Sequence, residues 1–248
     1  INIVYSPLDA LKLAQENPDK QIVFVGVGFE TTTPLVAMAI KRAQALGLNN
    51  FSVFVAHKNM PGALEAIVAD PQLEINALIL PGHVSTIIGV KPYEFLAHKY
   101  GIPGVITGFE PVDVLQGIAM IMRQLHEGRA EIEIAYTRGV MPEGNPVALA
   151  AIDEVFETVD ATWRGLGVIP GSGYAIRPEY AQFDAVKRFE PDVEPTQEPK
   201  GCRCGDVLRG MMAPNECPLF RKVCTPENPV GPCMVSSEGS CAAYYRYY

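Results

Sequence analysis

The stretch "QIVFVGVGFETTTPLVAMAIKRAQA" (residues 21–45) decides the fold of this chain. Residues 21–27 form a continuous apolar run rich in β-branched side chains, a pattern that predicts a strand. A Gly-Phe-Glu triplet follows, and the apolar spacing from about Thr31 to Ala45 predicts a helix. A strand that leads directly into a helix is the repeating unit of parallel α/β folds.

The alternation of strands and helices continues on both sides of this stretch. Upstream, "SPLDALKLAQEN" predicts a helix with Ser6 as its N-cap residue and Pro7 at its first position. Downstream, apolar strands that precede helical patterns are predicted at 51–56, 75–81 and 102–108, and the pair 131–137 and 145–159 continues the rhythm. The whole pattern predicts an α/β fold, with parallel sheets covered by helices on both faces in a Rossmann-like arrangement.

The Gly-Phe-Glu triplet occurs twice, at residues 28–30 and 108–110, each time between a predicted strand and a predicted helix. Open α/β folds place their sites at the carboxyl edge of the sheet, where both turns would lie. Neither turn is a phosphate-binding loop, because "GFETT" has neither the lysine nor the glycine spacing of one.

Several polar residues at these two turns are candidate binding residues. Capping of the helix starts is an alternative role for Thr31 and Asp113. For the glutamate of each triplet we favour a role in a cleft or between domains, because the triplet recurs in one structural position. The candidate set is Glu30, Thr31, Thr32, Glu110 and Asp113.

The overall composition narrows the function classes. The formal net charge is −8, which argues against a nucleic-acid-binding protein, since such proteins carry a basic face. No apolar run approaches the roughly 18–20 residues that a membrane-spanning helix needs, and no signal peptide is visible. We therefore expect a cytoplasmic protein that binds neither nucleic acid nor membrane. The first residue is not methionine, so we also expect a fragment of a longer protein.

A composition change near residue 200 predicts a domain boundary. Residues 190–200, "EPDVEPTQEPK", are polar and contain three prolines, which is typical of a linker. We therefore predict an α/β scaffold region over 1–189 with parts of two subdomains, a linker over 190–200, and a small irregular module over 201–248. That module is too short to bury a core of its own, so we expect a stabilising staple.

The staple is suggested by the cysteines, all six of which lie in this last segment: Cys202, Cys204, Cys217, Cys224, Cys233 and Cys241. The C-x2-C pair of structural zinc sites is absent, as are two common ferredoxin spacings. Four thiolates would suit a [4Fe–4S] cluster, and the remaining pair could cycle between dithiol and disulfide. A structural zinc ion and a disulfide knot are the alternatives.

The motifs "GCRCGDVLRG", "CPLF", "CTPENPVGPCMVSSEGSCAAYY", "GFETT", "PGHVS", "GFEPVD" and "WRGLGVIPGSG" together resemble the HypD family of [NiFe]-hydrogenase maturation proteins. The resemblance runs from about Val4 to the C-terminus and keeps the motifs in order. It implies α/β domains with a C-terminal [4Fe–4S] module. It also implies a scaffold and electron donor on which an Fe(CN)2CO unit is assembled, together with a HypC-type chaperone and HypE, with HypF acting upstream.

The resemblance also assigns roles to the cysteines and to two further residues. It gives Cys204 and Cys233 as the redox pair, and it places the acid Glu238 near the iron site. Within the C-x-C pair the assignment stays open, because Cys204 rather than Cys202 could be the cluster ligand. The implied cluster ligands are Cys202, Cys217, Cys224 and Cys241.

Among the histidines only His83, in "LPGHVSTIIG", is a candidate functional residue. It follows a predicted buried strand, and the resemblance places the matching histidine beside the iron-binding cleft. We expect it to donate a proton or to orient iron-bound ligands. His57, His98 and His126 have no partner pattern and are interpreted as structural.

One departure from the family pattern changes what this chain is expected to do. The family's C-G-x-H-x-H motif, whose cysteine binds the substrate iron, and its C-x-x-C pair are both missing. We therefore expect the family's N-terminal part to be absent and the chain alone not to carry the Fe(CN)2CO unit. The competing interpretations are a thiol–disulfide oxidoreductase similar to ferredoxin–thioredoxin reductase and a zinc-stapled adaptor.

Overall fold

The computed structural model describes residues 1–192 and 199–248, which fall into two compact units. Unit 1 comprises 1–63, 77–161 and 170–192, and unit 2 comprises 64–76, 162–169 and the described part of 193–248. The predicted linker at 190–200 includes residues 193–198, which lie outside the described residues.

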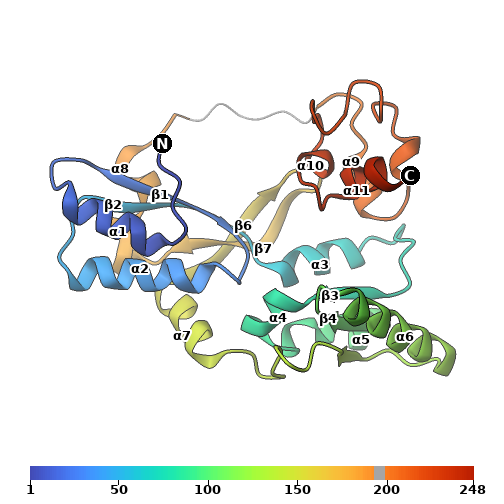
Figure 1. The fold of residues 1–248 in the computed structure, drawn as a ribbon. Coiled ribbons are helices and arrows are strands. Elements are labelled where there is room, and N and C mark those ends of the chain that lie inside the picture. Colours follow the sequence, from blue (N-terminus) through green and yellow to red (C-terminus); the bar gives the residue numbers. More distant parts are fainter. Residues whose placement is uncertain (193–198) are drawn as a thin grey trace. The chain divides into compact units, whose positions relative to one another are not determined.

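Unit 1 begins with a helix and a pair of parallel strands (Figure 1). Ser6 starts the first helix as predicted: its hydroxyl accepts from Leu8 N, and Asp9 accepts from Ser6 N in return. Strands β1 and β2 pair in parallel from Ile22–Phe51 to Gly28–His57. These elements are α1 (Pro7–Glu16), β1 (Ile22–Gly28), α2 (Thr33–Ala45), β2 (Phe51–His57) and α3 (Met60–Val68), the last of which continues into unit 2.

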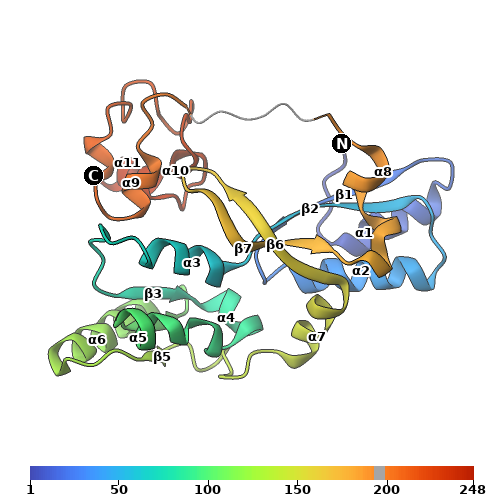
Figure 2. The same ribbon diagram turned by 180° about the vertical axis from the view of Figure 1, so that it is seen from behind.

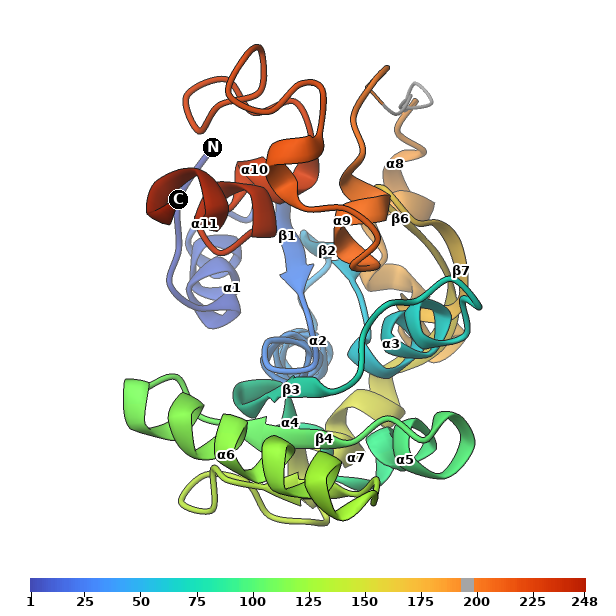
Figure 3. The same ribbon diagram turned by 90° about the vertical axis from the view of Figure 1, so that its right-hand side faces the viewer.

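A second parallel sheet in unit 1 has the order β3-β4-β5, and α6 lies along it (Figure 3). Gly117 allows α6 to approach β4 closely, because a Cβ there would lie 2.2 Å from Thr107 Cγ2. The elements of this part are β3 (Leu78–Pro81), α4 (Gly82–Ile88), the 3-10 helix η1 (Lys91–Tyr93), α5 (Glu94–Tyr100), β4 (Gly104–Thr107), α6 (Pro111–Glu127) and β5 (Ile132–Ile134).

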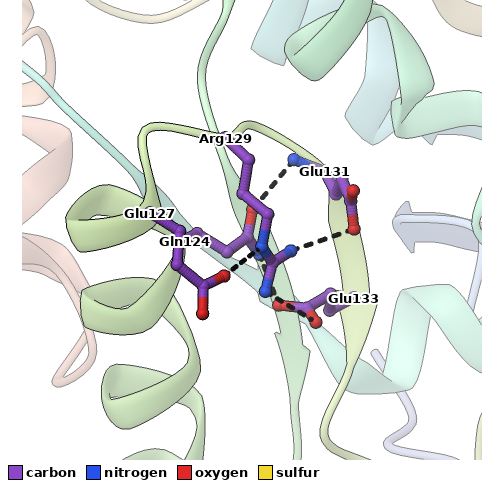
Figure 4. Close-up of polar contacts among 5 residues, drawn as sticks. All are labelled: Gln124, Glu127, Arg129, Glu131 and Glu133. Carbon is purple, nitrogen blue, oxygen red and sulfur yellow. Dashed lines mark hydrogen bonds and ion pairs between the residues drawn. The ribbon is translucent and has the colours of Figure 1, made fainter.

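The turn between α6 and β5 is held by charge pairing (Figure 4). Arg129 contacts Glu127 at 2.6 Å, Glu131 at 2.9 Å and Glu133 at 3.5 Å. The buried Gln124 donates to Glu133 and accepts from Glu131 N. Each of these three carboxylates therefore has a protein partner, and we interpret the group as structural.

The chain closes unit 1 with a helix, a two-stranded sheet and a short helical segment (Figure 2). A main core packs α1, α2, β2 and α7 together around buried side chains that include Ile40, Phe51 and Phe156. The elements are α7 (Pro146–Val155), β6 (Phe156–Trp163), β7 (Gly167–Ile176), the 3-10 helix η2 (Pro178–Phe183) and α8 (Ala185–Phe189), with the tips of β6 and β7 belonging to unit 2.

The predicted mixed α/β fold with parallel sheets is confirmed, with local differences. The stretch 145–159 is divided between the helix α7 and the strand β6, which begins at Phe156. The residues of β6, 156–163, alternate in burial, as a strand requires. The long strand β7 was not predicted, and β3 starts only at Leu78.

Unit 2 has a cysteine-lined core with short helices and turns. Cysteine side chains pack there with Val207, Phe220, Met234 and Ala242. Its helical elements are α9 (Cys204–Leu208), the 3-10 helix η3 (Pro214–Glu216), α10 (Pro232–Val235) and α11 (Ser240–Tyr247).

Candidate functional site

All six cysteines gather in unit 2 and are present as thiols. Cys204 begins α9, Cys233 lies in α10 and Cys241 lies in α11, so three short helices bring distant parts of the sequence to one core. Five of the six are buried, and Cys202 is half-buried. The clustering predicted from the sequence is therefore present.

Cys233 is hydrogen-bonded to two other thiols of this group. Its Sγ lies 3.1 Å from that of Cys241, to which it donates, and it also forms a side-chain hydrogen bond with Cys204. Cys202 interacts with the backbone of Cys204, and Cys224 accepts from Val230 N at 3.4 Å. The two residues of the predicted redox pair are therefore hydrogen-bonded to each other, and Cys233 is also hydrogen-bonded to Cys241.

The surroundings change the acidity of these thiols. The hydrogen bond from Cys204 lowers the pKa of Cys233, but the bond to Cys241 and burial outweigh it and raise that pKa. The Cys233 hydrogen bond lowers the pKa of Cys241, and burial raises the pKa of Cys202. Within this group of free thiols, Cys241 is thus the more acidic partner of the 3.1 Å pair.

A glycine provides room for the C-x-C thiol. A Cβ at Gly231 would lie 2.4 Å from Cys202 Sγ, so a larger residue there would displace the sulfur.

Within residues 1–192 and 199–248, no group of three or more His, Cys, Asp or Glu side chains is arranged to hold a single metal ion.

A network of ion pairs fixes the helix that carries Cys204. Arg209 donates to Asp70 and to Asp206, each at 2.7 Å, and to the carbonyl of Gly205. Arg203, which lies between the two cysteines of the C-x-C pair, also binds Asp206. The segment 64–76 is thereby tied to α9 within unit 2.

Glu238, the predicted acidic site residue, lies in a turn of unit 2. Its side chain is exposed, and its N–H donates to Ser236 Oγ at 3.2 Å. The turn directly precedes α11, which carries Cys241.

The first Gly-Phe-Glu turn of unit 1 buries its glutamate. Glu30 is 1% exposed, its Oε1 accepts from Met60 N at 3.0 Å, and its Oε2 has no partner within the described residues. Burial raises the pKa of Glu30 to about 7, although two backbone hydrogen bonds act in the opposite direction. The nearby carboxyl contributes to raising the pKa of Tyr93 and Tyr174, after their own burial.

The threonines that follow Glu30 are turn residues. Thr32 is the N-cap residue of α2, but its hydroxyl donates to the carbonyl of Phe29 instead of accepting from the helix. Gly28 has φ +138°, and a Cβ there would lie 2.4 Å from Thr32 Oγ1. Thr31 is half-buried and lies just before the helix. The turn thus needs glycine at position 28, because the side chain of Thr32 occupies the space that a Cβ would fill.

The second Gly-Phe-Glu turn leaves its glutamate in solvent. The Glu110 side chain is 77% exposed and lies 3.8 Å from Arg138. Asp113 is buried and receives two bonds from Arg138, one of them 2.7 Å long. The Arg138 side chain lowers the pKa of Asp113, and a backbone bond at Glu110 adds to this, so Asp113 also serves the helix start.

His83 lies in the same part of unit 1. It is the second residue of α4 rather than part of an open turn, and its side chain is exposed. Its ring lies 4.3 Å, between centroids, from that of Phe109 of the second triplet. The structure therefore brings His83 next to the Glu110 turn.

His57 is the polar residue whose environment the sequence interpretation missed. It ends β2 beside Gly28, is 2% exposed, and neither ring nitrogen has a partner within the described residues. Burial lowers the pKa of His57 to about 4. Its position at the carboxyl end of the strand next to Glu30 was the available signal.

No helix in residues 1–192 and 199–248 is both long enough and apolar enough to cross a bilayer.

Comparisons with known proteins all lead to hydrogenase maturation. The sequence model of the family described as "HypD: Hydrogenase formation hypA family" matches residues 1–248. The chain is 50% identical over 253 residues to the hydrogenase expression/formation protein HupD of Azotobacter chroococcum. It is 49% identical to the hydrogenase maturation factor HypD of Azotobacter vinelandii and 48% to that of Cupriavidus necator. Each match covers 100% of this chain and 67% of the relative.

Proposed function

The chain belongs to the HypD family, and from this premise we propose that it is a scaffold and electron donor for assembly of the Fe(CN)2CO unit of [NiFe]-hydrogenases. The observation that carries the proposal is the single buried core containing all six thiols. A HypC-type chaperone and HypE would be the partners, with HypF upstream, and the cytoplasm the location. Unit 1 would be the Rossmann-like scaffold.

The donor set of unit 2 fits a [4Fe–4S] cluster. Such clusters are held by four cysteine thiolates, and their potentials depend on hydrogen bonds to sulfur and on solvent exposure. Here the thiols are packed among apolar side chains, and Gly231 leaves space for Cys202. When bound, the cluster would supply single electrons. The proposed ligands are Cys202, Cys217, Cys224 and Cys241.

The chain's own part of the chemistry would be a dithiol cycle. Oxidation of Cys204 and Cys233 to a disulfide releases two electrons and two protons, and reduction takes up the same number. The contacts of Cys233 support this role, because it meets both Cys204 and Cys241. The ion pairs of Arg209 with Asp70 and Asp206 would hold α9, and with it Cys204, in place.

The iron being assembled is substrate. His83, Glu238 and the polar residues of the two Gly-Phe-Glu turns are proposed to serve its binding or the protonation steps around it. The support is geometric: His83 lies beside Phe109, and among the described residues one buried oxygen of Glu30 has no partner.

Anaerobic purification followed by iron and sulfide analysis of six single Cys→Ser variants tests the cluster. We expect the four ligand variants to lose iron and the two redox variants to retain it. The C-x-C pair is decided by comparing Cys202→Ser with Cys204→Ser. Retention of full iron in all six variants would contradict the assignment.

The assembly role needs a separate experiment. A HypD protein with its whole family length, carrying this chain's sequence in the matched region, is purified with the HypC-type chaperone and examined for cyanide and carbonyl infrared bands. We expect the bands in that complex and their loss in His83→Ala. Bands of full intensity in His83→Ala would exclude the proposed role of that residue.

A thiol–disulfide oxidoreductase is the second candidate, favoured by the 3.1 Å contact between Cys233 and Cys241. It predicts that this chain alone reduces a protein disulfide when given an electron donor. A zinc-stapled adaptor would instead contain zinc and no acid-labile sulfide.

A further inference from the structure

Cys202 is the most accessible thiol of unit 2. All six cysteines lie in the part of the chain that the structure describes; five of them are buried, and Cys202 is half-buried. The proposed dithiol cycle needs electrons from outside the chain, and buried thiols react poorly with a reductant in solution. Among these cysteines, Cys202 therefore marks the place where electrons can enter unit 2 most directly.

Two arginines flank Cys202. Arg203 is the next residue, and its side chain is 53% exposed. Arg164 comes from the turn between β6 and β7, is exposed, and donates to the carbonyl of Val230 at 3.3 Å. The residue after Val230 is Gly231, which lies against the sulfur of Cys202. Two segments that are far apart in the sequence thus bring guanidinium groups to the same part of unit 2.

The surroundings of this thiol carry more positive than negative charge. Arg209 and Asp70 neutralise each other, and Asp206 offsets one further cation. Arg164 binds a carbonyl group, and the exposed Lys200 makes no ion pair within residues 1–192 and 199–248. Two positive charges therefore remain in excess, in a chain whose formal net charge is −8. We call three exposed side chains the basic surface: Arg164, Lys200 and Arg203.

The charge of this surface and the chemistry beside it together indicate a partner. We propose that the basic surface docks a small acidic protein that carries one electron at a time. Opposite charges speed the encounter of two proteins, and exposed charges contribute little to affinity, so such a contact forms and separates readily. Transient contacts between electron-transfer proteins are accordingly small. The proposal rests on the redox function proposed above for unit 2.

The electrons balance over two encounters. Each of two reduced carriers gives up one electron and leaves oxidised. The two electrons, with two protons from water, open the Cys204–Cys233 disulfide, whose S–S bond breaks to give two thiols. Docking beside Cys202 places the carrier close to this pair, because a single residue separates Cys202 from Cys204.

The binding test uses the anaerobically purified 248-residue chain. The probe is a plant-type [2Fe–2S] ferredoxin, an acidic one-electron carrier. Calorimetry with the oxidised ferredoxin should give a Kd that rises about tenfold between roughly 20 and 300 mM NaCl, because salt screens exposed charges. Replacing all three residues of the basic surface by glutamine should weaken binding about tenfold at low salt, and Lys200→Gln alone about twofold. The matched control is Arg246→Gln, an exposed cation on α11 of the same unit, which should leave the affinity unchanged.

A reduction test separates this proposal from the redox function on which it rests. Dithionite, a small inorganic reductant, should reduce the chain and the triple glutamine variant at equal rates. Reduced ferredoxin should reduce the triple variant about tenfold more slowly than the unchanged chain at low salt. Failure of dithionite to reduce the unchanged chain would count against the redox function, and the binding result would then decide the surface.

Three results would overturn the proposal. The first is absence of ferredoxin binding to the unchanged chain at low salt. The second is equal weakening of binding by the triple variant and by Arg246→Gln. The third is equally tight binding of an acidic protein that has no redox centre, since the surface would then attract negative charge without selecting a carrier. Lys200→Gln replaces the triple variant if that variant unfolds, as judged by circular dichroism.

Discussion

The two Gly-Phe-Glu turns share sequence and position but have opposite environments. Each follows a parallel strand and precedes a helix. Glu30 is buried, with one oxygen that has no partner in the part of the chain that the structure describes, whereas Glu110 is exposed beside Arg138. Phe109 is 65% exposed and its ring lies 4.3 Å from that of His83, between centroids, whereas Phe29 is half-buried. Repetition of a motif in the sequence therefore does not repeat its electrostatics.

The difference comes from what surrounds each turn. The loop after β2 approaches the first turn, so that Met60 N reaches Glu30. At the second turn, Arg138 comes from the loop after β5 and neutralises Asp113. Within residues 1–192 and 199–248, no cationic side chain forms an ion pair with the acid of the first turn, Glu30. A buried acid without such a partner stores a free energy cost that the exposed acid avoids.

The largest difference between the two turns should appear when the glutamate of each, Glu30 or Glu110, is replaced by glutamine. At pH 8 we expect Glu30→Gln to raise the free energy of unfolding by about 1–3 kcal/mol, since burial holds its pKa near 7 and charging it costs stability. Glu110→Gln should change it by less than about 0.5 kcal/mol, as for other surface pairs. Denaturant unfolding measures both. Destabilisation by Glu30→Gln at pH 8 would mean that the carboxylate has a cationic partner.

The pH dependence of stability should show two opposing effects near the first turn. Glu30 has a raised pKa, so its contribution is best at low pH and declines as the pH rises from about 4.5 to 7. His57 has a lowered pKa, so stability is lost as the pH falls from about 6.5 to 4.

In the Glu30→Gln variant we therefore expect stability to rise as the pH increases from 4 to 6.5. In the His57→Gln variant we expect stability to fall as the pH increases from 4.5 to 7. Thermal unfolding across this range measures each profile. Identical profiles in the two variants would contradict the assignments.

At the second turn, the expected effect comes from Asp113. Asp113→Asn breaks the paired contact with Arg138 and should lower the melting temperature at pH 7. The pKa of Asp113 is lowered by Arg138, so this contribution is present at neutral pH and disappears as the pH falls through that pKa. A melting difference that persisted after Asp113 is protonated would show that it does not come from the ion pair. Glu110→Gln is the control.

The smallest effect should come from Phe109. Its side chain is largely exposed, so Phe109→Ala should change the free energy of unfolding by less than about 0.5 kcal/mol. The ring resonances of His83 should nevertheless shift in NMR spectra, because the two rings are 4.3 Å apart. Unshifted His83 signals would mean that the two rings are not in contact in solution, and His98 and His126 provide internal references.

Local sequence patterns were sufficient for most elements of unit 1. The Ser6 cap and the apolar run of β1 were predicted closely. The division of 145–159 between α7 and β6 was not predicted, because over so short a range its apolar residues fit both the helix period and the strand period. Helix α2 starts at Thr33, two residues later than expected, and the hydroxyl of Thr32 donates to Phe29 O in the turn just before it.

The candidate site was predictable where chemistry is carried by rare residues. Six cysteines within forty residues indicated their own grouping, and the structure brings them together. The sequence could not show that Cys233 lies between Cys204 and Cys241, since that depends on how α9, α10 and α11 pack. Nor could it show that His57 is buried with no hydrogen-bond partner among the described residues, because register and neighbouring side chains decide this.

Iron and acid-labile sulfide in the anaerobically purified 248-residue chain test the central claim most directly. The account predicts about four of each per chain, as for one [4Fe–4S] cluster, with loss of both in Cys217→Ser. Stoichiometric zinc without sulfide, or a metal-free chain that retains its fold, would contradict it.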